Sequence, residues 1–296
     1  MKKLVPLALV ALAACAVYFW WGLPSRGEVR ALAETNPGKT AVMRQREDEA
    51  RRAGRTPRTV QSWVPISRIS RHLVHAVVAA EDQKFFGHEG VDWDAVKESV
   101  EVNRAQHRFV RGGSTITQQL AKNLFVTTHK TITRKLRELI AARWLEDDLS
   151  KRRILELYLN VIEWGDGLYG CQAAAERYYG KACSDLGPDE AAGLAGMIPN
   201  PRRINPQVTP ARYSRAQRRV LWLMGHAGYA GGRGLGAEPP PVEVDEEEEG
   251  TAPVEAAEPT PSAHPSAPAQ TPSAEPSPEP IESPTPAAPS PTPQAR

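Results

Sequence analysis

The sequence predicts a mostly α-helical fold, and three observations support this expectation. Between residues 63 and 226, apolar side chains recur at intervals of three and four, which places them on one face of a helix. Ser150, Pro188 and Pro210 stand at positions where helices commonly begin. No alternation of apolar and polar residues of useful length occurs, so the sequence predicts no substantial β-sheet.

Composition separates this helical part from a long C-terminal tail. Seventeen of the 27 prolines lie between Pro239 and Pro293, interleaved with Ala, Ser, Thr and Glu. Such a segment has too few large apolar residues to offset the entropy cost of ordering it. We therefore expect residues 227–296 to be disordered and residues 63–226 to form one domain with a full hydrophobic core.

The net charge of +2 conceals an uneven distribution along the chain. From Ala237 to Arg296 there are 12 acidic residues and one basic residue, so the remainder carries a net charge of +13. A basic body of this kind favours an anionic partner such as a phosphate group or a membrane surface. Because no segment resembles a nucleic-acid-binding module, we expect no nucleic acid among the partners.

An uncharged segment follows two lysines at the N-terminus. The twenty residues Leu4–Leu23 are long enough to cross a bilayer core of ~30 Å, and the aromatic cluster Tyr18–Trp21 suits the far interface. We interpret residues 1–24 as a transmembrane signal-anchor of the inner membrane. The N-terminus would then lie in the cytoplasm and the body in the periplasm.

Two alternatives for this segment stay open. A cleaved signal peptide would need a shorter apolar core and a small-residue cleavage site, whereas here the apolar run continues through the aromatic cluster. Leu12–Cys15 resembles a lipoprotein box, in which Cys15 would be lipidated after cleavage. The basic residues Arg26 and Arg30 also weaken the orientation signal. A transmembrane anchor and a lipidated Cys15 would both leave the body tethered outside the membrane.

Residues 25–62 are polar and basic, which predicts a stalk and a lead-in to the domain. Asn36–Gly38 is a turn signal, and Arg46–Arg52 is expected to form a short charged helix. The apolar edge of the domain begins at Trp63–Ile66.

Acidic and aromatic residues gather at the end of the first predicted helix of the domain. The apolar residues of Leu73–Val78 recur at helical spacing and lead to Glu81 and Asp82, with Phe85 and Phe86 close behind. A carboxylate near apolar rings is desolvated, which raises its pKa and makes it a better base near neutral pH. The alternative is that both carboxylates simply end the helix in water.

A second polar cluster is predicted where two glycines precede a helix. Ser114 or Thr115 can cap this helix, and its exposed amides suit an anionic group. Gln119, Lys122 and Asn123 fall at i, i+3 and i+4, so their side chains share one face. The segment lacks the Walker pattern, so the sequence is only weak evidence for a phosphate-binding loop here.

Residues 133–145 form a strong helical pattern. The expected apolar stripe consists of Leu136, Leu139 and Ile140. On another face, Arg134 and Glu138 are one turn apart and Lys135 is adjacent. The alternative to a functional cluster is an ordinary exposed ion pair, which contributes only a few tenths of a kcal/mol.

Further helices are expected over residues 91–100, 150–160, 171–179, 188–198 and 209–224. The apolar stripe of the second of these consists of Ile154, Leu157 and Tyr158. Outside the N-terminal segment, the only cysteines are Cys171 and Cys183, which an oxidising compartment would allow to form a disulfide if a loop brings them together. No cluster with metal-ligand spacing is identified in the sequence.

Five separated motifs closely resemble glycosyltransferase family 51, the peptidoglycan glycosyltransferases. The motifs are Glu81–His88, Gly113–Gln119, Arg134–Glu138, Lys151–Asn160 and Gly170–Lys181. Their shared order and spacing make the match specific, and the resemblance covers roughly residues 35–225. Trp164–Gly167 and Met197–Pro201 are similar to the monofunctional biosynthetic branch of this family.

The resemblance implies a lysozyme-like helical glycosyltransferase domain that polymerises lipid II into β-1,4-linked glycan and releases polyprenyl pyrophosphate. It implies that Glu81 is the base for the acceptor hydroxyl and that Glu138 orients cations or sugar at the catalytic centre. The residues implied to bind substrate are Asp82, Phe85, His88, Ser114, Thr115, Gln119, Lys122, Asn123, Arg134 and Lys135. Of these, Lys122, Arg134 and Lys135 would hold the pyrophosphate.

The partners implied are lipid II, the nascent glycan strand, the inner membrane and other cell-wall synthesis proteins. No cofactor is required, although a divalent cation can take part. Two other functions stay open. A lysozyme-like lytic transglycosylase would share the helical domain and the catalytic Glu, but it has no pyrophosphate for the cationic motifs to bind. A membrane-anchored scaffold would bind glycan without catalysis.

Overall fold

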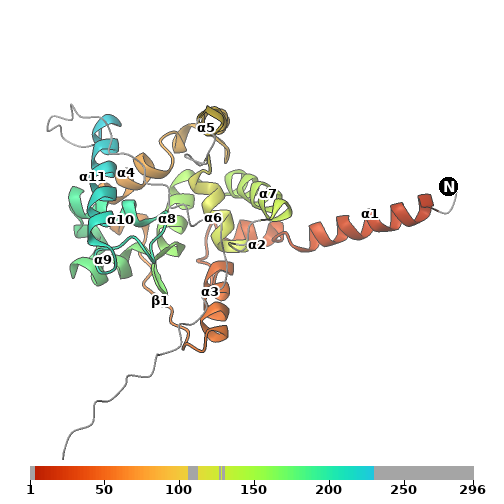
Figure 1. Cartoon of the computed structure of the whole chain (residues 1–296), viewed down its shortest axis with the longest axis horizontal. Coiled ribbons are helices and arrows are strands. Elements are labelled where there is room, and N and C mark those ends of the chain that lie inside the picture. The colour runs from red at the N-terminus through yellow and green to blue at the C-terminus, as the bar shows by residue number, and fades with distance from the viewer. Residues whose placement is uncertain (1–3, 106–112, 127, 129–130, 230–296) are drawn as a thin grey trace, which may run out of the picture. The chain divides into compact units, whose positions relative to one another are not determined.

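The computed structural model describes residues 4–105, 113–126, 128 and 131–229, and within them the protein is mostly helical, as the sequence predicts (Figure 1). The helices are α1 (Leu4–Trp21), α2 (Arg26–Ala31), α3 (Ala41–Arg52), α4 (Arg71–Glu81), α5 (Trp93–Ala105), α6 (Ile116–Phe125), α7 (Ile132–Asp148), α8 (Lys151–Val161), α9 (Cys171–Tyr179), α10 (Pro188–Met197) and α11 (Pro210–His226). The strands are β1 (Val60–Gln61), β2 (Glu163–Gly165) and β3 (Leu168–Tyr169). Short 3-10 helices are η1 (Ile66–Arg68), η2 (Phe85–Gly87) and η3 (Cys183–Asp185).

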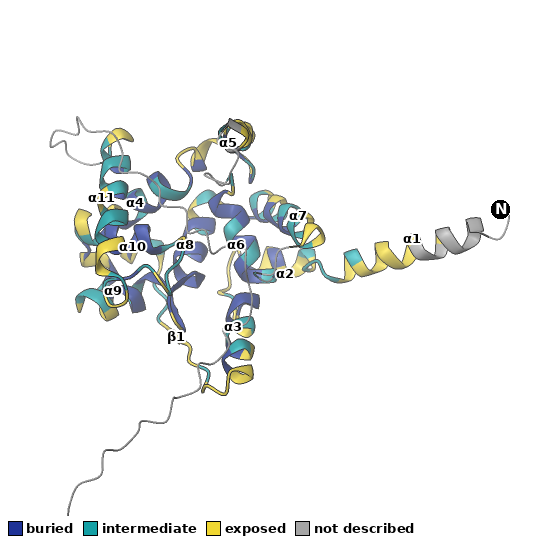
Figure 2. Ribbon diagram, in the orientation of Figure 1, coloured by how far each residue is buried: buried dark blue, intermediate teal, exposed yellow. Residues whose placement is uncertain are grey.

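Helices α6, α8 and α10 carry much of the buried core, as the dark blue segments of Figure 2 show. Helix α6 packs against α7 and α8, while α10 packs against α4 and α11. The largest fully buried side chains include Trp164, Tyr158, Tyr169 and Phe85. Two of these, Tyr158 and Phe85, lie next to the residues of the candidate site, so the core directly supports that site.

Helix starts are confirmed where the sequence carries an explicit signal. The Ser150 hydroxyl accepts a hydrogen bond from the Arg153 amide at 3.2 Å, and α8 begins at the next residue. Pro188 and Pro210 are the first residues of α10 and α11. Proline suits this position because its missing N–H would be unsatisfied there in any residue.

The apolar stripe expected for α7 is wrong in part. Leu136 is 47% exposed, whereas Ala141, Ala142 and Leu145 are buried. Glu138, which the sequence places on a polar face, is only 3% exposed. The helix is therefore rotated so that small residues and one carboxylate face the body, because close packing against α6 favours alanine at the contact.

A small sheet was not predicted. Its strand order is β1-β3-β2, with β1 parallel to β3 and β2 antiparallel to it. Each strand has only two or three residues. Alternation over so short a run cannot be distinguished from chance, so periodicity alone could not find these strands.

The sequence predicts a stalk over residues 25–62, but in the structure this segment supplies core residues. Val29 in α2 is fully buried and Met43 in α3 is 1% exposed. Helix α2 packs against α7, and α3 packs against α6. The predicted tail, residues 227–296, lies outside the described residues from position 230 onward.

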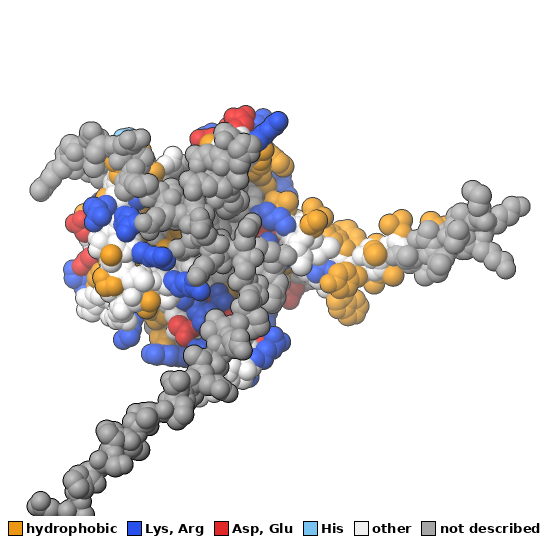
Figure 3. Space-filling view, in the orientation of Figure 1, with side chains coloured by type: hydrophobic (Ala, Val, Ile, Leu, Met, Phe, Trp, Pro, Cys, Tyr) orange, Lys and Arg blue, Asp and Glu red, His pale blue; other side chains and the backbone are white. Residues whose placement is uncertain are grey.

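Within the part of the chain that the structure describes, no helix is both long and apolar enough to count as a membrane span. Helix α1 exposes apolar side chains, among them Leu9, Leu12 and Trp21 (Figure 3). Its C-terminal end contacts α7, because Arg137 Nε donates a hydrogen bond to the carbonyl oxygen of Phe19 at 3.1 Å. The same guanidinium carbon lies 4.9 Å from the centre of the Tyr18 ring, a cation–π contact.

Candidate active site

Glu81 is the last residue of α4, and the packing of this helix determines where its carboxylate lies. The Ser70 hydroxyl caps the helix start, and Leu73, Ala76 and Val77 along one face are fully buried. The C-terminal end of α4 is thereby held beside α6. There, Gln119 Nε2 donates a hydrogen bond to Glu81 Oε2 at 2.7 Å.

The environment of Glu81 raises the pKa of its carboxyl group. Burial is the main cause, and the negative charge of Asp82 adds to it. The hydrogen bond from Gln119 and the charges of Lys122 and Arg219 act in the opposite direction without cancelling the effect. A carboxylate with a raised pKa is a stronger base near neutral pH, as the sequence predicts for this residue.

Asp82, directly next in sequence, has a different environment. Its two carboxylate oxygens lie 2.9 and 3.0 Å from His88 Nε2, and one of them accepts the Ile116 amide at 3.0 Å. Ile116 is the first residue of α6, so the carboxylate also faces the positive end of that helix. Asp82 is buried, so the alternative of a solvated helix end is wrong for this residue.

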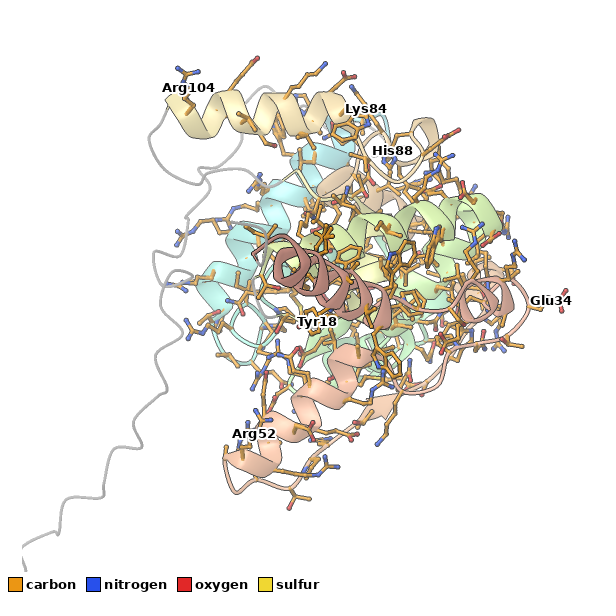
Figure 4. The ribbon with its side chains drawn as sticks, turned by 90° about the vertical axis from the view of Figure 1, so that its right-hand side faces the viewer. Tyr18, Glu34, Arg52, Lys84, His88 and Arg104 are labelled. Carbon is orange, nitrogen blue, oxygen red and sulfur yellow. The ribbon has the colours of Figure 1, made fainter. Side chains whose placement is uncertain are left out.

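Phe85 and His88 complete the wall beside Asp82. Phe85 is fully buried, and the centres of its ring and the His88 ring are 6.3 Å apart in an edge-on arrangement. Lys151 Nζ lies 4.6 Å from the centre of the Phe85 ring. Figure 4 shows His88 and Lys84 on the same side of the molecule, near the start of α5. An open hollow of ≈ 570 Å³ lies there and is lined in part by His88, Phe86 and Trp93.

Thr115 caps α6 and ties it to the loop before α5. Its hydroxyl accepts the Gln118 amide at 3.2 Å and donates to the Gly90 carbonyl oxygen at 2.7 Å. Gln118 Nε2 donates to the same oxygen at 3.2 Å. Thr115 is only 2% exposed, so its polar groups are already used inside the protein.

Gln119 lies at the centre of the site. Besides its contact with Glu81, its Oε1 accepts a hydrogen bond from the Tyr158 hydroxyl at 2.8 Å. Asn123 Nδ2 donates to the backbone carbonyl oxygen of Gln119 at 2.8 Å. Sequence reasoning assigned Tyr158 to the apolar stripe of α8 and missed this contact. A hydroxyl within an otherwise apolar stripe was the available signal, because a buried phenol requires a hydrogen-bond partner.

Cations gather around the buried carboxylate of Glu138. Arg134 Nη1 lies 2.6 Å from one of its oxygens and Lys135 Nζ lies 2.5 Å from the other. Lys135 Nζ also donates to Gln118 Oε1 at 2.8 Å and to Ser114 Oγ at 3.2 Å. The alternative of an ordinary exposed ion pair is therefore wrong, because Glu138 is buried and its cluster links α7 to α6.

The charges of Glu81 and of the cluster around Glu138 both act on Lys122. Burial is the main cause of a lowered pKa at its ammonium group, and the positive charges of Arg134 and Lys135 add to this effect. The carboxylates of Glu138 and Glu81 act in the opposite direction. The charges of both acids therefore act on Lys122.

The structure thus brings together most of the residues predicted for the site. Glu81 is hydrogen-bonded to Gln119, and Glu138 pairs with Arg134 and Lys135. Lys135 also contacts Gln118, the neighbour of Gln119 on α6, and Lys122 lies on the same helix. Asp82, Phe85 and His88 form the adjacent wall. Among residues 4–105, 113–126, 128 and 131–229, no group of three or more His, Cys, Asp or Glu side chains could hold a metal ion. Participation of a divalent cation stays a prediction.

Cys171 and Cys183 are buried free thiols. Burial raises the pKa of the Cys171 thiol well above its usual value, and a hydrogen bond with the Cys183 thiol adds to this effect. Cys171 begins α9 and Cys183 begins η3, and these two elements are in contact, which is consistent with the predicted disulfide. The disulfide itself stays a prediction.

Residues 49–225 match the family model described as Transglycosylase, which covers more than half of the chain. The chain belongs to the transglycosylase family. A protein of Dechloromonas aromatica strain RCB, named biosynthetic peptidoglycan transglycosylase, is 48% identical over 196 residues, which are 66% of this chain and 85% of that protein. A protein of the same name from Azoarcus sp. strain BH72 is 45% identical over 219 residues, covering 73% of this chain and 95% of that protein.

These similarities confirm the expected family and the enzyme class, a glycosyltransferase of peptidoglycan biosynthesis. The matched segment contains every residue of the candidate site described above, from Glu81 to Tyr158. In this transglycosylase, the partly buried Glu81 and the cluster around Glu138 both lie inside the matched segment.

Proposed function

We propose that this transglycosylase polymerises lipid II into β-1,4-linked glycan strands and releases polyprenyl pyrophosphate. The observation that carries the proposal is the combination of one desolvated carboxylate, Glu81, with the cations Lys122, Arg134 and Lys135 in a single site. A pyrophosphate is already a good leaving group. The site therefore needs one base and a set of cations, rather than the acid and nucleophile of many glycosidases.

In the proposed reaction, Glu81 takes the proton of the 4-hydroxyl group of the acceptor GlcNAc. The acceptor oxygen then attacks C1 of the donor sugar, and the bond from C1 to the pyrophosphate oxygen breaks with its electron pair on that oxygen. One displacement of this kind inverts the donor α-linkage into a β-1,4 bond. The cations near Glu138 would neutralise the charge that develops on the departing pyrophosphate.

The remaining predicted residues support these groups in different ways. Asp82 and Thr115 make their hydrogen bonds to the protein itself, and His88 contacts Asp82 through Nε2, so we assign all three to holding the pocket walls. Lys135 Nζ donates a hydrogen bond to Ser114 Oγ, so we assign Ser114 to the side of the site that would bind the pyrophosphate. Glu138 would keep Arg134 and Lys135 in position while leaving a net positive charge for the anion.

We further propose that residues 1–24 anchor the chain in the inner membrane, with the catalytic domain in the periplasm. The uncharged run Leu4–Leu23 after two lysines supports this topology. Because lipid II is itself a membrane lipid, a tether would raise its effective concentration at the site. In the periplasm the domain could also contact other cell-wall synthesis proteins.

The test is polymerisation of labelled lipid II by the full chain in detergent, measured beside Glu81→Gln. We expect long glycan chains from the parent and none from the folded variant. Glu89→Gln is the matched control, because Glu89 is exposed and pairs with Arg143 on the surface. Detergent and divalent cations are varied in every arm.

An absence of polymer from the folded parent under all these conditions would contradict the proposal and favour a non-catalytic scaffold. Cleavage of purified peptidoglycan in place of polymerisation would favour a lytic transglycosylase. The cation cluster argues against the lytic reaction, because glycan cleavage has no pyrophosphate for Arg134 and Lys135 to neutralise.

A further inference from the structure

A chain of two hydrogen bonds leads from the core to the base. The Tyr158 hydroxyl donates to Gln119 Oε1 at 2.8 Å, and Gln119 Nε2 donates to Glu81 Oε2 at 2.7 Å. Tyr158 is fully buried in α8, Gln119 is partly buried on α6, and Glu81 ends α4. These two hydrogen bonds therefore link three helices, and Tyr158 is the most deeply buried of the three residues.

A glutamine side chain presents an acceptor at one end of its amide and two donors at the other. Rotation of the amide by half a turn would exchange these ends, so that an oxygen would face Glu81. We propose that Tyr158 is a positioning residue, whose hydroxyl holds the Gln119 amide with its N–H groups toward Glu81 throughout the reaction. The inference rests on the proposed role of Glu81 as the base.

The orientation of the Gln119 amide matters most when Glu81 is protonated. Once Glu81 has taken a proton, its new O–H group would gain a strong hydrogen bond if Gln119 turned its oxygen toward it. Tyr158 opposes that rotation, because its hydroxyl would lose the acceptor that it now has. With the Gln119 amide fixed in this orientation, the O–H group of protonated Glu81 has no amide oxygen to donate to. The fixed amide therefore favours the ionised form of Glu81, which can accept a proton.

The other charged groups around Glu81 do not supply this effect. Lys122 on α6 and Arg219 on α11 favour the ionised form, and Asp82 opposes it. Their influence on the pKa of Glu81 is electrostatic and does not depend on the direction of the Gln119 amide. The pKa of the Tyr158 phenol is itself raised well above its usual value, chiefly by burial, so Tyr158 keeps its proton and stays a donor.

Tyr158→Phe tests the proposal, because it removes only the hydroxyl and keeps the ring that fills the core. We expect the acid limb of the pH–rate profile for lipid II polymerisation to move to higher pH, with about a three- to tenfold loss of rate on that limb. At alkaline pH the rate should approach that of the parent. Tyr178→Phe is the matched control, because the Tyr178 hydroxyl donates to the Trp164 carbonyl oxygen, outside this hydrogen-bond chain.

A second readout needs no activity. The carboxyl infrared band of Glu81, assigned by subtraction of the Glu81→Gln spectrum, gives the titration of this residue in the full chain. We expect Tyr158→Phe to shift that titration to higher pH and Tyr178→Phe to leave it unchanged. Gln119→Leu, which removes the donor without altering the buried ring, should shift it in the same direction.

The inference is overturned if Tyr158→Phe leaves the titration of Glu81 unchanged or lowers the rate equally at all pH values. If Tyr158→Phe does not fold, the titration of Glu81 is compared between Gln119→Leu and the parent. An unchanged titration in Gln119→Leu overturns the inference. A shifted titration in a chain that makes no polymer would support the positioning role and contradict the proposed function. The two failures are thus distinguishable.

Discussion

Asp82 and His88 form a nearly buried pair in which His88 Nε2 lies 2.9 and 3.0 Å from the two carboxylate oxygens of Asp82. The same carboxylate accepts the Ile116 amide at the start of α6. Glu81, the neighbouring acid, accepts a hydrogen bond from Gln119. Two consecutive carboxylates thus have different environments, since Asp82 contacts a histidine and a backbone amide whereas Glu81 accepts a hydrogen bond from a glutamine.

Replacing His88 by alanine should destabilise the protein by about 1–3 kcal/mol, because a buried carboxylate loses a hydrogen-bond donor. Burial already raises the pKa of Asp82, and without His88 it should rise further. Protonation then relieves the loss, so the deficit in Tm should be smaller at pH 4 than at pH 8. Thermal unfolding at both pH values measures this. His72→Ala, at an exposed position of α4, is the control, and an equal deficit at both pH values would contradict the argument.

Glu81→Gln should abolish polymerisation yet raise Tm above neutral pH. Because the folded pKa of Glu81 is raised, the folded protein binds more protons than the unfolded chain between the two pKa values. The stability that this provides is present at low pH and is lost as the pH rises through the folded pKa. Glutamine has no such loss, and each ~1 kcal/mol regained corresponds to about 2–4 °C in Tm. A Tm below that of the parent at pH 8 would contradict this account.

Glu138→Gln should have the opposite effect on stability. Glu138 is buried and balances Arg134 and Lys135, so its neutralisation leaves two cations facing each other. We expect a loss of about 1–3 kcal/mol, measured by chemical denaturation. Asp94→Asn is the control, because Asp94 pairs with Lys84 on the surface and its removal should change stability little. Equal stability of Glu138→Gln and the parent would show that the cations are held by other groups.

The neighbouring thiols of Cys171 and Cys183 predict a disulfide in protein produced in an oxidising compartment. Because both residues are buried, labelling must be done after denaturation without reductant. We expect neither cysteine to react, and both to react once a reductant is added. Closing so short a loop should stabilise the protein by roughly 3 kcal/mol, which thermal unfolding with and without reductant would detect. Reaction of both cysteines before reduction would contradict the disulfide.

Local signals in the sequence were sufficient for the helices whose ends carry explicit chemistry. Ser150, Pro188 and Pro210 each mark the start of a helix in the structure. These signals act within one turn of the backbone, so they do not depend on the rest of the fold. Glu81 and its motif could likewise be singled out from the order of residues along the chain, through the resemblance that the family match confirms.

Contacts between distant segments could not be read in this way. The sequence places Leu136 inside and Glu138 on a polar face, but the packing of α7 on α6 reverses this order. It also predicts a stalk where Val29 and Met43 enter the core. Periodicity reports which residues share a face and carries no information about which face a neighbouring helix will cover.

The sequence by itself therefore determined the helical class, the main helices and the transglycosylase family, and it singled out most residues of the candidate site as predictions. Only the tertiary structure decided that Tyr158 reaches Gln119, that Gln119 reaches Glu81, and that Glu138 is buried between Arg134 and Lys135. The contacts of Gln119 with Tyr158 and with Glu81 join residues far apart in the chain, whereas Glu138 and its two cations are close in sequence and only their burial depends on the fold. They exist because the packing of α4, α6, α7 and α8 brings the atoms within hydrogen-bond distance, and buried polar groups must then find their partners there.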